Sequence, residues 1–155
     1  MITTAQAIAK YGKPNETGKG YLVTIQLPYP MRLAWDHDTK VKKMSCHKLL
    51  ADKFTAVFND LLAEYGYEKI VELGIDLYGG CFAFRKMRGG TDWSRHSWGI
   101  AIDLDPERNK LKESALTARF AKPEYKPMID IFYKHGFVGL GPEKNYDWMH
   151  FEIKE

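Results

Sequence analysis

The stretch Ser94–Pro106 reads "SRHSWGIAIDLDP" and places a histidine, a glycine and two aspartates around a short apolar run. The apolar run predicts a short strand, and side chains at even offsets along a strand point to the same face. Asp103 therefore shares its face with Ala101 and Gly99, which are small and leave room beside the carboxylate. We expect this strand to carry an acidic ligand and the loop that enters it to carry His96.

A second stretch, Asp147–Glu152, reads "DWMHFE" and again sets a carboxylate and a histidine on either side of apolar residues. His150 would come from a strand beside the first one. Zinc in a catalytic site takes three protein ligands, typically imidazoles and a carboxylate, and keeps one position for water. His96, Asp103 and His150 supply such a set, so the two stretches together predict a zinc site, with Zn²⁺ as the cofactor.

Further polar residues near these stretches are candidates for catalysis and substrate binding. Asp147 lies three residues before the second histidine; it is predicted to hold the water at the open zinc position and to pass its proton to a leaving amine. Arg85 and Arg88, in "FRKMRGG", are candidates for stabilising an oxyanion or binding a substrate carboxylate. Ser94 and Trp148 are candidates for binding the substrate. Each residue alone also suits an ordinary structural role, so the prediction depends on the two stretches together.

The rest of the sequence predicts helices and further strands around the two stretches. Apolar residues at helical spacing, with capping residues at the ends, indicate helices over Thr4–Tyr11, His47–Tyr65 and Pro123–His135. Strands are predicted over Tyr21–Gln26, Leu77–Arg85, Gly99–Leu104 and Met149–Ile153. Helices and strands without regular alternation favour an α+β fold. We expect a small antiparallel sheet with flanking helices, in a single domain over residues 1–155, with the zinc site on the sheet.

The composition is that of an ordinary globular domain, with 155 residues of which 45% are hydrophobic and 28% are charged. No apolar run approaches the roughly 20 residues that span a bilayer, and the N-terminus lacks the pattern of a secretory signal. We therefore expect neither membrane insertion nor a signal peptide. The formal net charge of +3 is mild, and no nucleic-acid-binding motif accompanies it. Cys46 and Cys81 lack metal-site spacing and are expected to be reduced, buried thiols.

The two stretches resemble the motifs of a zinc peptidase family. "SRHSWGIAID" is similar to the family motif S-x-H-x-x-G-x-A-x-D, and "HGFVGLGPEKNYDWMHFE" resembles its closing segment, where a Gly-Phe turn precedes an acid-x-x-His-Phe-Glu strand. This family comprises D-Ala-D-Ala carboxypeptidases and dipeptidases together with L-alanyl-D-glutamate endopeptidases, and it includes compact phage endolysins. The resemblance covers about Phe84–Glu152 and implies a fold like that of hedgehog proteins and D-Ala-D-Ala peptidases.

The resemblance also implies roles for individual residues. The zinc ligands that it implies are His96, Asp103 and His150. Asp147 takes the place of the general base and acid, and the implied substrate is a peptidoglycan stem peptide. Arg85 lies where the family has a transition-state arginine, but "FRKMR" lacks the serine and the glutamine expected there. This role is therefore open between Arg85 and Arg88.

These observations favour a zinc endopeptidase that cuts the L-Ala–D-Glu bond of bacterial peptidoglycan, in the manner of a phage-type endolysin. Such an enzyme is expected to act as a monomer and to stay in the cytoplasm of the host cell until it is released to the periplasm or cell wall. One alternative changes only the bond and is a D-Ala-D-Ala carboxypeptidase or dipeptidase. An alternative of another class is a non-catalytic zinc-containing domain that binds the wall or a partner protein. An oligonucleotide-binding module leaves the paired histidines and aspartates unexplained.

Overall fold

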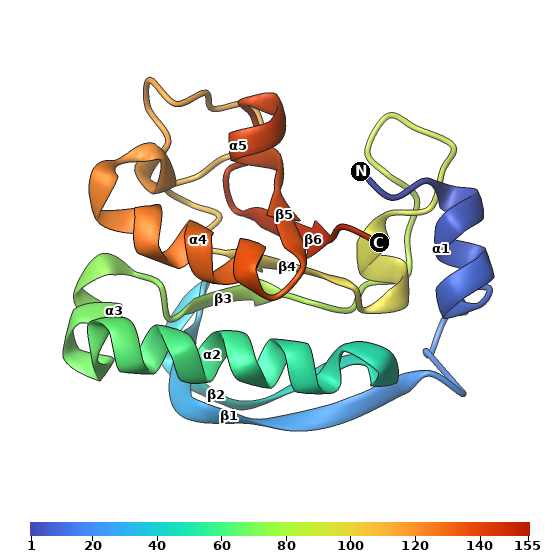
Figure 1. Cartoon of the computed structure of the whole chain (residues 1–155), viewed down its shortest axis with the longest axis horizontal. Coiled ribbons are helices and arrows are strands. Elements are labelled where there is room, and N and C mark those ends of the chain that lie inside the picture. Colours follow the sequence, from blue (N-terminus) through green and yellow to red (C-terminus); the bar gives the residue numbers. More distant parts are fainter.

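The computed structural model describes residues 1–155 and consists of one six-stranded sheet with helices packed against it (Figure 1). The helices are α1 (Thr4–Tyr11), α2 (Ala51–Tyr65), α3 (Tyr67–Leu73), α4 (Lys126–Lys134) and α5 (Leu140–Lys144). The strands are β1 (Leu22–Leu33), β2 (Asp36–His47), β3 (Leu77–Gly80), β4 (Ala101–Leu104), β5 (Phe137–Gly139) and β6 (His150–Ile153). None of the helices is long and apolar enough to cross a membrane.

The strands lie in the order β2-β1-β3-β4-β6-β5. β1 runs parallel to β3, and every other neighbouring pair is antiparallel. The parallel pair arises because α2 and α3 connect β2 to β3 and return the chain to the far side of β1. The expected α+β class is therefore confirmed, whereas the expectation of a small, purely antiparallel sheet is wrong.

The hairpin of β1 and β2 extends the sheet well beyond the strand expected over Tyr21–Gln26. β1 passes through Pro28 and Pro30, and its register with β2 is interrupted between Gln26 and Met31. Proline has no N–H to donate to the hydrogen-bond ladder of a sheet, so within strands it is confined to edges and to irregularities such as this one. β2 was not predicted, because most of its side chains are exposed and many are charged. Charged side chains are typical of an edge strand, which is where β2 lies.

The three expected helices are confirmed, with small shifts at their ends. Thr3 caps α1 in a capping box, and Gly12 ends the helix. α2 and α4 each begin three or four residues later than expected because a 3₁₀ turn precedes them. The strand expected over Leu77–Arg85 is shorter and ends at Gly80, whose φ of 119° leaves the extended region. α3, α5 and β5 were not predicted, and each has seven residues or fewer.

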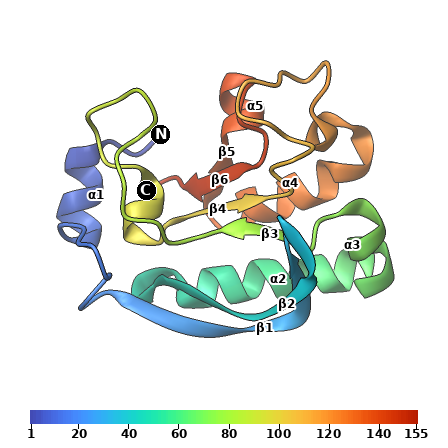
Figure 2. The same cartoon turned by 180° about the vertical axis from the view of Figure 1, so that it is seen from behind.

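Helices α2, α3 and α4 lie on one face of the sheet (Figures 1 and 2). Phe151 of β6 stacks on Phe132 of α4 with 4.1 Å between the ring centroids, so this residue of β6 points towards the helices. Because side chains alternate along a strand, His150 and Glu152 point to the opposite face. The alternation separates the polar residues of β6 from the hydrophobic core.

Candidate metal centre

The pairing of β4 with β6 brings two of the predicted ligands together. Asp103 lies directly opposite His150 in the antiparallel register, and its Oδ1 atom is 3.1 Å from Nδ1 of His150. The other carboxylate oxygen, Oδ2, is 3.2 Å from Nε2 of His96. One ligand atom from each of the three residues lies within 4.8 Å of the others. The structure thus brings His96, Asp103 and His150 together as the sequence predicted.

His96 reaches the cluster from a 3₁₀ turn, Arg95–Trp98, that precedes β4. Ser94 caps this turn, because its hydroxyl accepts a hydrogen bond from the backbone N–H of His96. Gly99 ends the turn with a left-handed φ of 70°, and a Cβ atom there would lie 2.9 Å from the backbone nitrogen of His47. Glycine is therefore required at this position by both conformation and space.

The hydrogen bonds of His96 fix its tautomer. Its Nδ1 atom lies 2.9 Å from the carbonyl oxygen of Cys81, and a carbonyl can only accept, so Nδ1 carries the proton. Nε2 then presents a lone pair to the cluster. This nitrogen is buried and has no hydrogen-bond partner, since Asp103 lies near it but outside hydrogen-bonding geometry. Buried polar atoms are rarely left without a partner, and a metal ion would supply one.

His150 is oriented by a residue that the sequence analysis did not single out. Its Nε2 atom lies 3.0 Å from Oε1 of Glu152, which is buried, while Nδ1 faces Asp103. Burial alone would lower the pKa of His150, but the hydrogen bonds to the two carboxylates outweigh it and raise the pKa to about 10. The same contacts, with the nearby His96, hold the pKa of Asp103 below its ordinary value despite burial. The strand alternation in "HFE" places Glu152 on the face of His150 and would have identified it.

The spacing of these atoms suits a single metal ion. The two histidines contact different oxygens of the Asp103 carboxylate, at 3.2 Å and 3.1 Å. One ligand atom from each of the three residues lies within 4.8 Å of the others, which is close enough for a single ion to contact all three. Two imidazoles and one carboxylate are also the donor set of a catalytic zinc site that keeps a position for water. The residues present therefore fit the metal.

Asp147 lies beside the cluster in an unusual backbone conformation. Its φ is 53°, in the left-handed region that non-glycine residues rarely adopt. Its backbone N–H donates to Leu111 and its carbonyl accepts from His150. Burial is the main reason that the pKa of the Asp147 carboxyl is raised to about 6, with a further contribution from the charge of Asp103. Backbone strain and a shifted pKa at one residue are typical of a functional site.

The two candidate arginines differ in their relation to Asp147. The charge of Arg88 is among those that lower the pKa of Asp147. Arg85 instead donates to the carbonyl of the neighbouring Lys86 at 3.3 Å, and both arginines are exposed. The role predicted for an arginine therefore stays a prediction for both Arg85 and Arg88.

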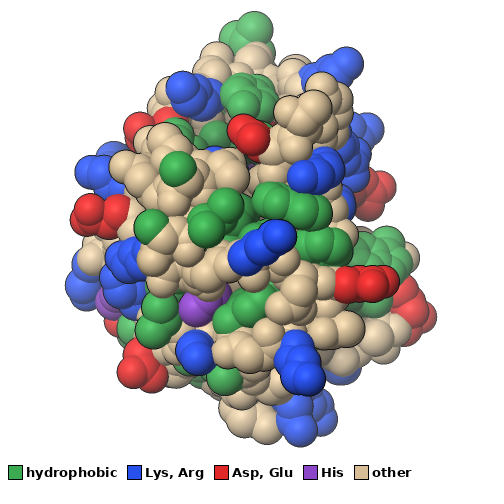
Figure 3. Space-filling view, turned by 90° about the vertical axis from the view of Figure 1, so that its right-hand side faces the viewer, with side chains coloured by type: hydrophobic (Ala, Val, Ile, Leu, Met, Phe, Trp, Pro, Cys, Tyr) green, Lys and Arg blue, Asp and Glu red, His purple; other side chains and the backbone are tan.

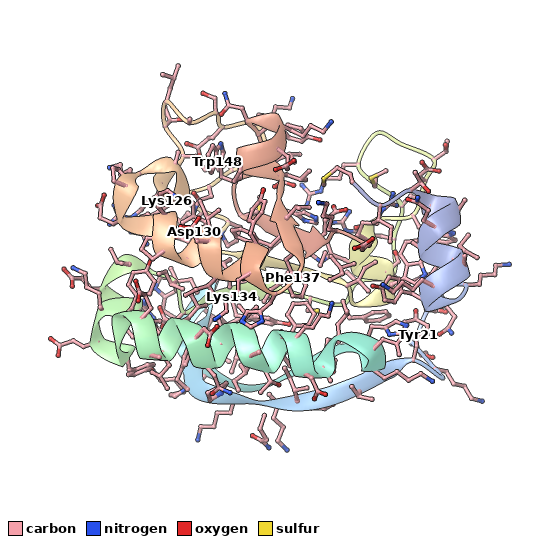
Figure 4. All side chains as sticks on the ribbon, in the orientation of Figure 1. Tyr21, Lys126, Asp130, Lys134, Phe137 and Trp148 are labelled. Atoms are coloured by element: carbon pink, nitrogen blue, oxygen red, sulfur yellow. The ribbon has the colours of Figure 1, made fainter.

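The predicted substrate-binding residues Ser94 and Trp148 make contacts within the protein. Ser94 is buried at the start of the His96 turn. Trp148 packs over Gly141 of α5, where a Cβ atom would lie 2.2 Å from the indole ring, and its Nε1 donates to Asn145 (Figure 4). Their contact with a substrate stays a prediction.

The remaining histidines make structural contacts outside the cluster. His37 lies 3.2 Å from the carbonyl of Ala34, and His135 contacts Asp60. His47 is buried, and its Nε2 lies 3.0 Å from the carbonyl of Tyr11. Cys46 and Cys81 are buried free thiols, as predicted.

A surface hollow of about 460 Å³ lies away from the metal cluster, between α2 and α4. Lys134, Asp130 and Asp60 line it, and Figure 4 shows the first two on α4. A second hollow, of about 360 Å³, lies beside Arg32 and Arg108. Neither hollow is lined by a residue of the cluster. The candidate site is therefore identified by the types and arrangement of its side chains, and not by the size of a cavity.

Residues 88–153 match a protein family described as D-alanyl-D-alanine carboxypeptidase. The matched segment contains the three residues of the cluster together with Arg88 and Asp147, and it spans less than half of the chain. At the level of the family, this match supports a zinc peptidase that acts on peptidoglycan. Comparisons with curated proteins and with solved structures gave no match.

Proposed function

We propose that this protein is a zinc metallopeptidase of the D-Ala-D-Ala carboxypeptidase and L-alanyl-D-glutamate endopeptidase family that hydrolyses peptidoglycan stem peptides. The observation that carries the proposal is the convergence of His96 and His150 on Asp103, with the buried Nε2 of His96 left without a hydrogen-bond partner. The family match over residues 88–153 supports it independently.

The chain supplies a complete set of groups for peptide hydrolysis. Zinc, when bound, acts as a Lewis acid and lowers the pKa of water to about 7. The carboxylate of Asp147, whose pKa is raised to about 6, accepts a proton from the attacking water near neutral pH and returns it to the leaving amine. We assign the stabilisation of the substrate's carbonyl oxygen, or the binding of a substrate carboxylate, to the exposed guanidinium of Arg88.

For the scissile bond we propose L-Ala–D-Glu, as in a phage-type endolysin, with bacterial peptidoglycan as the partner. The excess of basic residues, which gives a net charge of +3, suits an anionic wall. An endopeptidase of this kind would act as a monomer after release from the host cytoplasm. The alternative within the family is a D-Ala-D-Ala carboxypeptidase or dipeptidase, which must bind a free C-terminal carboxylate and would use an arginine for it.

Mass spectrometry of peptidoglycan digested by the purified, zinc-loaded protein distinguishes these reactions. A new N-terminal D-Glu supports the endopeptidase, and released D-Ala supports the carboxypeptidase. If the zinc-loaded protein yields no product at all, the peptidase proposal is wrong and a non-catalytic zinc domain that binds the wall or a partner protein takes its place.

Variants of the cluster test the metal and the reaction separately. His96→Ala, Asp103→Ala and His150→Ala are each expected to lose zinc and activity together. Asp147→Ala is expected to keep zinc and lose lysis. His37→Ala serves as the control, because His37 lies outside the cluster, and it should change neither. Zinc content is measured by elemental analysis beside wall lysis.

The two arginines are separated by the same assay. Arg88→Ala is expected to reduce turnover with unchanged zinc content, because its charge acts at the side of Asp147. Arg85→Ala is expected to have the smaller effect. The reverse result would assign the role to Arg85, in the position of the family's arginine.

A further inference from the structure

The turn that carries His96 is held in place by the N-terminal segment of the chain. Arg95–Trp98 is a 3₁₀ turn of four residues, and the hydrogen bonds of a 3₁₀ helix have poorer geometry than those of an α-helix. We propose that α1 is a brace for the metal centre, with Arg95 and Trp98 as positioning residues that set the place of His96. This proposal rests on the metal site of the proposed function and extends it to residues 1–12, which lie outside the family match.

Arg95 connects the beginning of the turn to the beginning of α1. One terminal nitrogen of its guanidinium, Nη2, donates to the carbonyl of Ile2 at 2.8 Å. The other, Nη1, donates to the hydroxyl of Thr4 at 3.2 Å and to the carbonyl of Trp93 at 2.9 Å. A planar guanidinium with several fixed donors holds three groups at once. It thereby joins the chain on the N-terminal side of the turn to the first residues of the molecule.

Trp98 connects the end of the turn to the end of α1. Its ring is fully buried, and its Nε1 donates to the carbonyl of Gly12, the residue that ends the helix, at 2.6 Å. The guanidinium of Arg95 lies over the same ring, 5.8 Å from its centroid. The two ends of α1 are thus bonded to the two ends of the turn, with His96 between them.

α1 is in turn fixed to the strand that carries the second imidazole. The hydroxyl of Tyr11 donates to the carbonyl of Glu155, just after β6, at 2.8 Å. Figure 1 shows the C-terminus next to the yellow turn and α1, in blue, beside both of them. A separate contact holds the turn from the opposite side, where the hydroxyl of Tyr21 donates to Ser97 at 2.8 Å. One helix therefore links the supports of His96 and His150.

The exposure of α1 shows that packing into the core is a small part of its role. Only Ala7 and Tyr11 of the helix are buried. Ile8 is 41% exposed, and Figure 3, which looks at the side that carries α1, shows hydrophobic side chains across the middle of this face. The hydrogen bonds of the N-terminal segment with the rest of the molecule go to the His96 turn, to Glu155 after β6 and to His47 at the end of β2.

Zinc affinity of the purified full chain tests the brace. Arg95→Ala and Trp98→Phe are measured by competition with a chromophoric chelator, beside the thermal midpoint of the zinc-free proteins. Trp98→Phe keeps a buried aromatic ring but removes the Nε1 donor and part of the ring volume, so the thermal midpoint reports the cost of the cavity. Arg95→Lys keeps the charge without the fork of donors. We expect Arg95→Ala and Trp98→Phe to weaken zinc binding about 10-fold or more, in the range found for residues that orient metal ligands. Arg95→Lys should restore at most part of the zinc affinity that Arg95→Ala loses.

Matched controls separate positioning from general destabilisation. Trp35→Phe changes an exposed tryptophan, and Lys126→Ala removes a cation from α4; both should bind zinc as the original chain does. If zinc affinity stays within twofold in Arg95→Lys and Trp98→Phe while they remain folded, the brace is overturned and the proposed function stands. If the unaltered chain itself binds no zinc, both proposals fall.

Discussion

At the scale of single residues, each imidazole of the metal cluster uses one nitrogen for the protein and presents the other to the centre. His96 donates to the carbonyl of Cys81, and His150 faces Glu152. The two histidines and Asp103 could be predicted as metal ligands because their residue types and spacing are typical of a zinc site. The sequence did not predict their supports, because a carbonyl from another segment and a second carboxylate become partners only once the strands are paired.

Glu152 is predicted to strengthen zinc binding by orienting His150. Glu152→Gln keeps the size of the side chain and removes the charge that favours a proton on Nε2 of His150, so the lone pair on Nδ1 is no longer fixed towards the cluster. We expect zinc affinity to fall about 10- to 100-fold, measured by chelator competition. The control is Glu143→Gln, at an exposed carboxylate of α5 bonded to Tyr133. Equal affinity of Glu152→Gln and the unaltered chain would contradict the role.

Asp147 is predicted to cost stability at neutral pH in the zinc-free protein. Burial raises its folded-state pKa to about 6, above the value of about 3.9 of an unfolded chain, so the native state binds the proton more tightly. Stability then falls as pH rises from about 4 to about 6 and is level above that. Asp147→Asn removes the buried charge and keeps a residue that tolerates the left-handed conformation.

We therefore expect Asp147→Asn to be more stable than the unaltered chain by about 1–2 kcal/mol at pH 7 and to lose activity. Urea unfolding of both zinc-free proteins at pH 4 and pH 7 measures the difference, which should be small at the lower pH. A variant that is less stable at pH 7 would show that the carboxylate has a favourable partner.

At the scale of elements, the sequence predicted those whose pattern is local. α1, α2 and α4 have apolar residues at helical spacing and recognisable ends, and β4 and β6 combine apolar residues with the predicted ligands Asp103 and His150. β2 is exposed and rich in lysine, and β5 has three residues. These two strands exist because β1 and β6 offer edges for pairing, and that information lies far away in the sequence.

The contact between α2 and α4 is predicted to depend on pH through Asp60. Its carboxylate contacts Nε2 of His135 at 2.7 Å and Nζ of Lys134 at 3.2 Å. These contacts lower the pKa of Asp60, the hydrogen bond to His135 most of all. The stabilisation is complete above the unfolded-state pKa of about 3.9 and is lost as pH falls through the lower folded-state value.

Asp60→Asn is therefore expected to destabilise the protein by about 0.2–1 kcal/mol at pH 7, the range for a partly exposed ion pair. The difference should shrink below pH 4, as seen by thermal unfolding. Asp130→Asn is the matched control, because Asp130 pairs only with Lys126 of its own helix and should change stability less. If the difference in stability between Asp60→Asn and the unaltered chain grows as the pH falls, the carboxylate of Asp60 is not the source of the stabilisation.

At the scale of the whole molecule, the proposed metal centre joins three segments that are separate in the sequence. His96 belongs to a turn held by the N-terminal helix, Asp103 lies on β4, and His150 lies on β6 near the C-terminus. An ion bound to all three resists unfolding, because the unfolded chain does not hold them together. The predicted ligand set came from the sequence, whereas the contacts of residues 1–12 with the His96 turn required the tertiary structure.

Removal of zinc is therefore predicted to lower the stability of the entire chain in one cooperative transition. At free zinc of 100 times the dissociation constant, binding adds about 2.7 kcal/mol, which corresponds to about 5–10 °C in the thermal midpoint for a chain of this size. Calorimetry of the protein with zinc and with a chelator measures the shift, and His150→Ala should show none. A midpoint that chelation leaves unchanged, in a protein shown by elemental analysis to have held zinc, would mean that the ion binds outside the three segments.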